Sequence, residues 1–177
     1  MINQKNLYLA VGLLAISLTS ALLIHAQQQE KRDNQMTQKQ MDEMNMRGDK
    51  HMGFDHLKTR HHFFLANDGG AIQVEANDAN DTESRDQIRG HLRHITMMFS
   101  EGNFKVPMLV HEKTPPGSEV MQKLKGEITY EYKDTDSGAL IQISTANQQA
   151  LQAIHKFLRF QIKEHMTGDP LEVKARN

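Results

Sequence analysis

The sequence predicts an α+β domain of two ββα units, giving a four-stranded antiparallel sheet with two helices on one face. Three observations predict this fold: two pairs of short alternating strands, an amphipathic helical pattern after each pair, and the local similarity of "GGAIQV" to "SGALIQI". A single hairpin is marginally stable, but two hairpins can form one sheet that helices cover. We expect this domain to occupy residues 51–170.

Residues 1–26 have the pattern of a signal peptide or an N-terminal membrane anchor. Lys5 precedes an uncharged run at residues 7–24, which ends near Ala26 and is followed at once by glutamine. A short basic start, an apolar run and a small residue before a polar segment are typical of secretory signals. If uncleaved, the run is just long enough to span a membrane. In either case we expect the remaining chain to be periplasmic or otherwise extracytoplasmic.

Residues 27–50 are rich in Gln and Met and contain no aromatic or aliphatic core residue. Such a segment buries too little apolar surface to offset the entropy lost on ordering. Gln, Lys, Glu and Met favour helices, so a frayed helix is an alternative. The composition favours a flexible tether.

The first ββα unit begins with "HHFFLANDGGAIQVEAND", which predicts two strands around an Asn-Asp-Gly-Gly turn with Gly69 and Gly70 at positive φ. "DTESRDQIRGHLRHITMMF" then predicts a helix that Asp81 or Thr82 caps and that ends near Gly102. Its apolar residues recur at the spacing of one helical face. They are Ile88, Leu92, Ile95 and Phe99.

The second unit begins with "GEITYEYKDTDSGALIQIST", again strand, turn and strand. A helix follows in which Thr145 and Gln148 have the spacing of a capping box. Between the units, "VPMLVH" is interpreted as a short edge strand and "SEVMQKLK" as a short helix capped by Ser118. We expect the chain after Gly168, including the tail at 171–177, to be frayed.

Composition excludes several classes of function. The chain has 177 residues and a formal charge of −1, so there is no basic surface for nucleic acid. Cysteine is absent, which excludes disulfides, thiolate zinc sites and thiol catalysis. No phosphate-binding glycine loop, GxSxG motif or HExxH motif is present. A hydrolase using His91 or His111 as general base is the least supported alternative, and the sequence leans away from an enzyme.

Histidine and methionine are the remaining candidate ligands, with 10 and 11 copies. Neutral imidazoles bind copper, zinc, nickel and iron, and a pair at i, i+3 on a helix can start a chelate. Each helix histidine has a structural alternative, a hydrogen bond at the border of the core. The candidate imidazole ligands are His56, His61, His62, His91, His94 and His111.

The methionines near residue 44 lack apolar neighbours, unlike those in the later helices. Thioethers favour Cu(I), and an exported chain without cysteine would have to use Met and His to bind it. The alternative is a helix-prone tether in which Met replaces Leu or Gln. The candidate thioether ligands of a second, softer site are Met44, Met46 and Met52.

These patterns support two hypotheses. The first is an exported, membrane-tethered or secreted protein that binds a transition metal, copper ahead of zinc, with His56, His61 and His62 as primary ligands. The second is a non-enzymatic envelope domain that recruits a protein partner through an open sheet face or edge strand.

Four segments carry a resemblance: "MGFDHLKTRHHFFL", "DTESRDQIRGHLRHI", "VPMLVHEKTPPG" and "AIHKFLRFQIKEHMTGDP". Through them the chain resembles a family of small exported bacterial proteins over roughly residues 51–170. The resemblance implies export but transfers no mechanism. Some members carry the name aspartate carbamoyltransferase, yet the STRT and HPxQ patterns that bind carbamoyl phosphate in the true enzyme are absent here.

Overall fold

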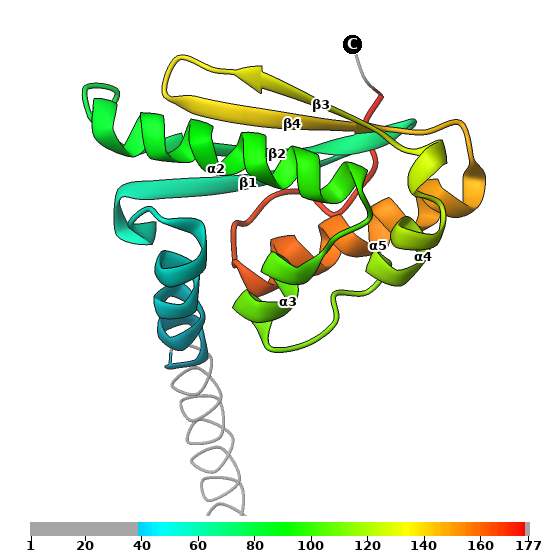
Figure 1. The fold of residues 1–177 in the computed structure, drawn as a ribbon, viewed down its shortest axis with the longest axis horizontal. Coiled ribbons are helices and arrows are strands. Elements are labelled where there is room, and N and C mark those ends of the chain that lie inside the picture. The colour runs from blue at the N-terminus through cyan, green and yellow to red at the C-terminus, as the bar shows by residue number, and fades with distance from the viewer. Residues whose placement is uncertain (1–38, 176–177) are drawn as a thin grey trace, which may run out of the picture. The chain divides into compact units, whose positions relative to one another are not determined.

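The computed structural model describes residues 39–175, which form an α+β fold around a four-stranded antiparallel sheet (Figure 1). The first hairpin is β1 (Thr59–Ala66) with β2 (Gly69–Ala76), and the second is β3 (Thr129–Asp134) with β4 (Gly138–Ser144). The order β1-β2-β4-β3 joins the hairpins through their second strands. The predicted α+β class with a four-stranded antiparallel sheet is confirmed.

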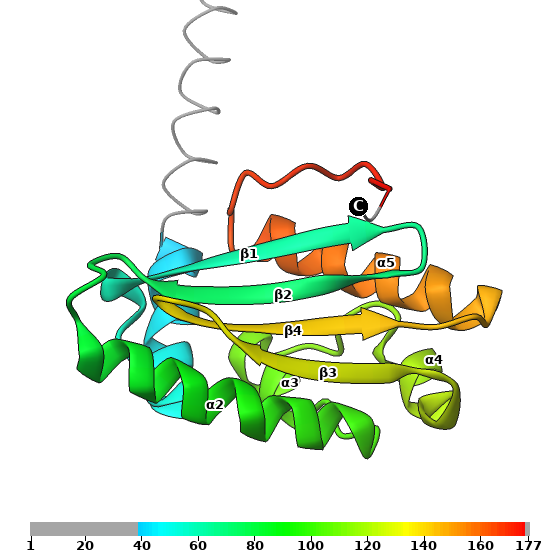
Figure 2. The same ribbon diagram turned by 90° about the horizontal axis from the view of Figure 1, so that it is seen from above.

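Each hairpin precedes a long helix, α2 (Thr82–Ser100) after the first and α5 (Gln148–Glu164) after the second. Between the units lie α3 (Lys105–His111), α4 (Ser118–Lys123) and the 3-10 turn η2 (Lys125–Glu127), and a further 3-10 turn, η1 (His56–Lys58), precedes β1. Figure 2 shows α2 running beside β3 and α5 running beside β1 and β2.

The core lies where alternate strand residues meet the helices. In β1 and β2 the pairs His61–Val74 and Phe63–Ile72 lie opposite each other. Ile141 of β4 is fully buried and pairs with Ile72. The face of α2 predicted from its spacing is buried, and Asp81 caps that helix by accepting a hydrogen bond from the amide of Ser84. These side chains build the walls of the site described below.

The segment predicted as an edge strand is helical: α3 covers "VPMLVH". Pro107 lies in the first turn, where a missing backbone N–H breaks no helical hydrogen bond. Val110 and His111, in the last turn, are both buried. A short apolar run of this kind does not distinguish strand from helix.

Two predicted caps were wrong. Asn147 caps α5 by accepting hydrogen bonds from the amides of Gln149 and Ala150, while the Thr145 hydroxyl accepts one from the amide of Asn147. Ser118 is the first residue of α4, and its hydroxyl donates to the carbonyl of Pro115. Both hydroxyls therefore make hydrogen bonds that stabilise the loop before the helix, and neither caps the helix.

The first hairpin turns at Asn67 and Asp68, and the two glycines predicted for the turn begin β2. Gly69 has φ 150°, whereas Gly70 does not have positive φ. A Cβ on Gly69 would lie 2.1 Å from the carbonyl oxygen of Ile143 on the neighbouring strand. Close approach of two strands, rather than a tight turn, therefore requires glycine there.

The part of the predicted tether that the structure describes is helical, over residues 39–52. Met44 is only 4% exposed, and Arg47 donates a hydrogen bond to the carbonyl of Val110 at 2.8 Å. These contacts offset the conformational entropy that the segment loses on ordering, which its composition alone does not explain. The predicted signal or anchor at 1–26 and the rest of the tether lie outside the described residues. Within residues 39–175, no helix is long and apolar enough to cross a membrane.

The chain after Gly168 is not frayed as far as residue 175. Asp169 accepts a hydrogen bond from the backbone amide of Phe63 at 2.9 Å. The amide of Lys174 donates to the carbonyl of Leu65, and its carbonyl accepts from the amide of Asn67. This segment thus pairs with the outer edge of β1, where unpaired backbone groups would otherwise face solvent.

Candidate histidine–methionine site

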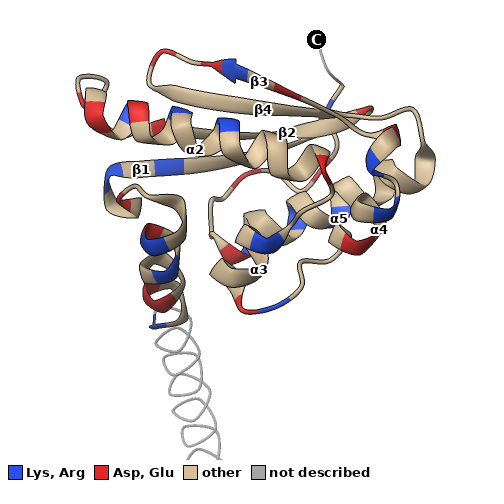
Figure 3. Ribbon diagram, viewed as in Figure 1, with Lys and Arg blue, Asp and Glu red and all other residues tan. Residues whose placement is uncertain are grey.

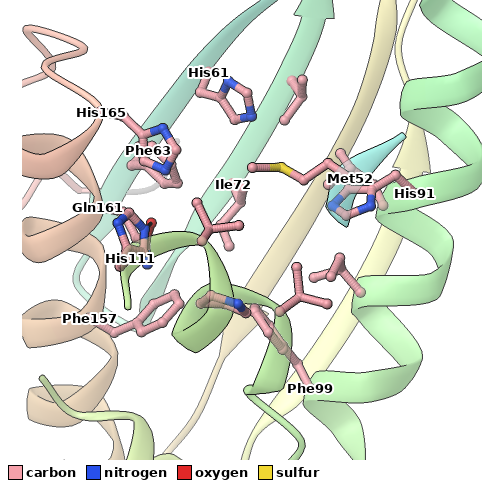
Figure 4. A pocket seen from close by; sticks show the side chains of 16 residues that line it. Met52, His61, Phe63, Ile72, His91, Phe99, His111, Phe157, Gln161 and His165 are labelled. Carbon is pink, nitrogen blue, oxygen red and sulfur yellow. Dashed lines mark hydrogen bonds between the residues drawn. The ribbon is translucent and has the colours of Figure 1, made fainter. Parts of the chain in front are cut away.

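A cavity of about 60 Å³ opens between the sheet and the helices α2, α3 and α5 (Figure 4). Its walls are mostly apolar, and residues from β1, β2 and all three helices line it. The thioether of Met52 extends into it in Figure 4. The lining side chains that carry a nitrogen or sulfur atom are Met52, His61, His91, His111, Gln161 and His165.

Four imidazole rings follow one another in contact along one side of this region. The ring centroids of His56 and His61 lie 5.3 Å apart, and their planes are nearly parallel at 10°. His61 stacks on His165 at 5.1 Å, and His165 meets His111 edge to face at 5.1 Å. Segments distant in the sequence therefore bring their histidines together: η1, β1, the end of α5 and the end of α3.

A second set of ring contacts surrounds Phe54, which is 3% exposed. Its ring centroid lies 5.6 Å from that of His56, 5.9 Å from that of His61 and 5.5 Å from that of His91. Phe54 thus packs apolar surface against three imidazoles. A low-polarity surrounding of this kind disfavours the charged forms of His61 and His91.

Burial keeps His61, His91 and His165 neutral at ordinary pH. The pKa of His61 falls to about 3, mainly through burial, with smaller contributions from the neighbouring His56, His91 and His62. The pKa of His91 falls to about 4, mainly through burial and then through His94 and His56. Burial also lowers the pKa of His165, to well below its usual value. A neutral imidazole presents one free lone pair, which is the form that binds a metal ion.

The pKa of His111 is also lowered by burial, against the opposing effects of a hydrogen bond to Gln161 and the charge of Glu164. Its Nε2 lies 3.0 Å from Oε1 of Gln161. An amide oxygen accepts, so Nε2 carries the proton and Nδ1 holds the lone pair. Nδ1 is buried and has no hydrogen-bond partner among the described residues, and the same is true of Nε2 of Gln161.

His56 is held by a carboxylate. Its Nδ1 lies 2.6 Å from Oδ1 of Asp49, and that same oxygen accepts a hydrogen bond from the His56 backbone amide at 2.9 Å. The side chain of His56 is 6% exposed. A carboxylate on Nδ1 fixes the tautomer with the lone pair on Nε2, as carboxylates do for metal-binding histidines.

Two neighbouring rings each leave a buried nitrogen without a hydrogen-bond partner. Among residues 39–175, Nε2 of His56 and Nε2 of His61 are both buried and have no hydrogen-bond partner. Unpaired buried polar atoms are uncommon in proteins, because each costs about 1–3 kcal/mol of desolvation. The pair of nitrogens is therefore a candidate ligand-binding site.

The structure brings together only some of the residues predicted as ligands. His56 and His61 lie in ring contact, and His61, His91, His111 and Met52 line one cavity. His62 points away from it and bonds to Asp169, with 3.0 Å between Nδ1 and Oδ1. Adjacent strand residues face opposite sides of a sheet, so His61 and His62 cannot share one ion.

The predicted second site of three thioethers is not assembled. Met44 is 4% exposed and Met46 is 72% exposed, because residues two apart on a helix point in different directions. His94 is also exposed. Within residues 39–175, no group of three or more His, Asp or Glu side chains is arranged so that it could hold a metal ion.

Sequence reasoning did not select three residues that the geometry places here: Asp49, Gln161 and His165. His165 could have been found, since it continues the buried face of α5 at eleven residues after Ile154. Nothing in the sequence relates Asp49 to His56, seven residues on, because the turn at Gly53 sets their approach.

The chain was compared with protein-family models, with curated proteins and with solved structures, and no match was found in any of the three.

Proposed function

We propose that this protein binds a soft transition-metal ion, with copper as Cu(I) ahead of zinc. The ligands are Nε2 of His56 and Nε2 of His61, and the thioether of Met52 supplies a third donor from the cavity side. The observation that carries the proposal is the pair of buried, unpartnered imidazole nitrogens whose rings lie 5.3 Å apart.

The donor set favours copper over zinc. Structural zinc sites are almost always four-coordinate and are built from Cys, His and carboxylates. Thioether sulfur is a soft ligand that favours Cu(I). A site of two imidazoles and Met52, in apolar surroundings that include Phe54, matches the chemistry of Cu(I) better than that of Zn²⁺.

Asp49 plays the part of an orienting carboxylate in this proposal. It accepts the Nδ1 proton of His56, which holds the ring still and raises the basicity of Nε2. The low pKa of His61 means that no proton has to leave that ring before an ion binds at neutral pH.

The test is a titration of the full-length chain with Cu(I) in competition with a chromophoric chelator. We expect one tight site per chain, lost in a His56→Ala/His61→Ala double variant. The matched control is His62→Ala, which removes a neighbouring imidazole that points elsewhere and should leave the affinity unchanged. Equal binding by the double variant and the unaltered chain would refute the assignment.

The proposal includes a location outside the cytoplasm, and its support is the apolar segment at residues 1–26. Membrane fractionation and N-terminal sequencing of the mature protein would test it and would distinguish a cleaved signal from an anchor.

A second candidate function is a non-enzymatic interaction domain. It is favoured by β3, which pairs with β4 on one side only and forms an edge of the sheet. Such an edge can recruit an extended peptide by strand addition. This function predicts partner crosslinking that is the same with and without copper and is unchanged in the His56→Ala/His61→Ala variant.

A further inference from the structure

Three potential soft-metal ligands follow one another at three-residue spacing on α2: His91, His94 and Met97. Residues three apart are neighbours on a helix surface, so these side chains form one slanted row. Exposure increases along the row. His91 lines the cavity and is half-buried, His94 is exposed, and Met97 is 62% exposed. The row therefore leads from the solvent to the cavity wall.

The first two members of the row lie near each other. The charge of His94 contributes to lowering the pKa of His91, after the larger effect of burial, so the two rings lie within interaction range. Met98 and Phe99, which follow Met97, are buried in the core. Met97 itself points away from that core, which leaves its thioether available to a ligand in solution.

Two arginines of α2 near the row interact with the second hairpin. Arg89 donates to the carbonyls of Gly138 and Thr135, and Arg93 lies 3.2 Å from the carboxylate of Asp134. After Arg93, the remaining residues of α2 include no Lys, Arg, Asp or Glu (Figure 3). A cation approaching His94 and Met97 therefore has Arg93 as its nearest fixed positive charge on this helix, and the carboxylate of Asp134 offsets that charge.

We propose that His94 and Met97 form a surface capture site for Cu(I), from which the ion passes to His91 at the cavity wall. This inference rests on the proposed function, because the interior site is the destination. The transfer is a ligand exchange with no change of oxidation state. One dative bond to the ion forms at His91 as one at Met97 or His94 breaks. His61, Met52 and His56 then form bonds to the ion as those to His91 and the remaining surface ligand break.

The kinetic test follows loading of the full-length chain by stopped flow, with Cu(I) supplied from a weak chelator. We expect His94→Ala and Met97→Leu each to slow loading about tenfold, the effect of a barrier about 1.4 kcal/mol higher. Equilibrium affinity should stay unchanged, because neither residue belongs to the interior site. Met46→Leu removes another exposed methionine from a different helix and is the matched control. Unaltered loading rates in both α2 variants would overturn the proposal.

A second measurement separates failure of this inference from failure of the proposed function. Ag(I), a redox-inert analogue, is titrated into the His56→Ala/His61→Ala variant while the methionine methyl resonances are followed by NMR. We expect the Met97 methyl signal to shift, and the shift to disappear when His94→Ala is added. A Met97 signal that does not respond to Ag(I) rules out the capture site, whatever the equilibrium titration of the interior site shows.

Discussion

The imidazole ring of His56 packs directly against the backbone of Gly48: a Cβ at Gly48 would lie 2.3 Å from Cε1 and 2.6 Å from Nε2 of that ring. The glycine thus makes room for the nitrogen proposed to bind the ion. Asp49, the next residue, holds Nδ1 of the same ring. Two adjacent positions on one helix therefore set the place and the orientation of His56.

Replacing Gly48 with Ala should weaken Cu(I) binding while leaving the fold intact. The added methyl group has to displace the His56 ring, whereas alanine favours the helix by about 1 kcal/mol over glycine. Gly90→Ala is the matched control, since Gly90 also lies in a helix and a Cβ there meets nothing within 4 Å. Competition titration and urea unfolding of both variants check this. Gly90→Ala should gain stability without any loss of affinity, and equal affinities in the two variants would contradict the account.

Replacing Asp49 with Asn should lower the affinity for Cu(I) by about 10- to 100-fold, the usual effect of removing a carboxylate that orients a metal-binding histidine. The amide cannot accept the Nδ1 proton as strongly, so His56 loses its fixed tautomer. Asp55→Asn offers a control from the same turn, because Asp55 caps η1 and bonds to the amide of Leu57 instead. Binding that resists the first change but not the second would exclude this role for Asp49.

Stability should fall as the solution is acidified below about pH 6.5. His61 and His91 have pKa values of about 3 and 4 in the folded chain and 6.5 when unperturbed, so only the unfolded chain takes up their protons in this window. The unfolded state is then favoured by up to about 1.4 kcal/mol per pH unit for each histidine. Above pH 7 the stability should be flat with respect to these groups.

Urea unfolding between pH 7.5 and pH 5 measures this slope. His91→Leu removes one of the buried titrating rings, so its unfolding free energy should depend less steeply on pH than that of the unaltered chain. Parallel curves for the two proteins would show that His91 does not titrate as its burial requires.

Replacing Asp169 with Asn should release the segment after Gly168 from β1. Burial alone would raise the pKa of Asp169, but hydrogen bonds from Thr167, His62 and the amide of Phe63 outweigh it and lower that pKa. Losing a hydrogen-bonded carboxylate of this kind costs about 1–3 kcal/mol. We expect faster hydrogen exchange at the amides of Phe63 and Lys174. Asp136→Asn, at an exposed position between β3 and β4, should change neither exchange nor stability.

Local periodicity predicted most of the fold. Alternating residues in the two hairpins and the spacing of Ile88, Leu92, Ile95 and Phe99 each report on one element, and burial follows them directly. The strand prediction for the α3 segment was wrong because seven apolar-rich residues fit a strand and a helix equally well. The prediction of a flexible tether was wrong for the described residues before 52. Their helix is stabilised by tertiary contacts of Met44 and Arg47, which composition does not encode.

The site was predicted only in part, for a geometric reason. Residue type identified His56, His61 and Met52 as candidates, but the same reasoning grouped His62 with His61, and the structure directs His62 to Asp169 on the opposite face. The contact of His61 with His165 joins residues from β1 and the end of α5, and only the packing of those elements sets it. The same holds for Asp49 and His56, whose hydrogen bond depends on the turn at Gly53.

X-ray absorption spectroscopy of the Cu(I)-loaded full-length chain tests the central claim most directly. The account predicts two imidazole nitrogens and one thioether sulfur around the ion, with the sulfur contribution lost in Met52→Leu and the imidazole contribution lost in His56→Ala/His61→Ala. A copper environment of nitrogen and oxygen ligands alone, unchanged by these substitutions, would contradict it.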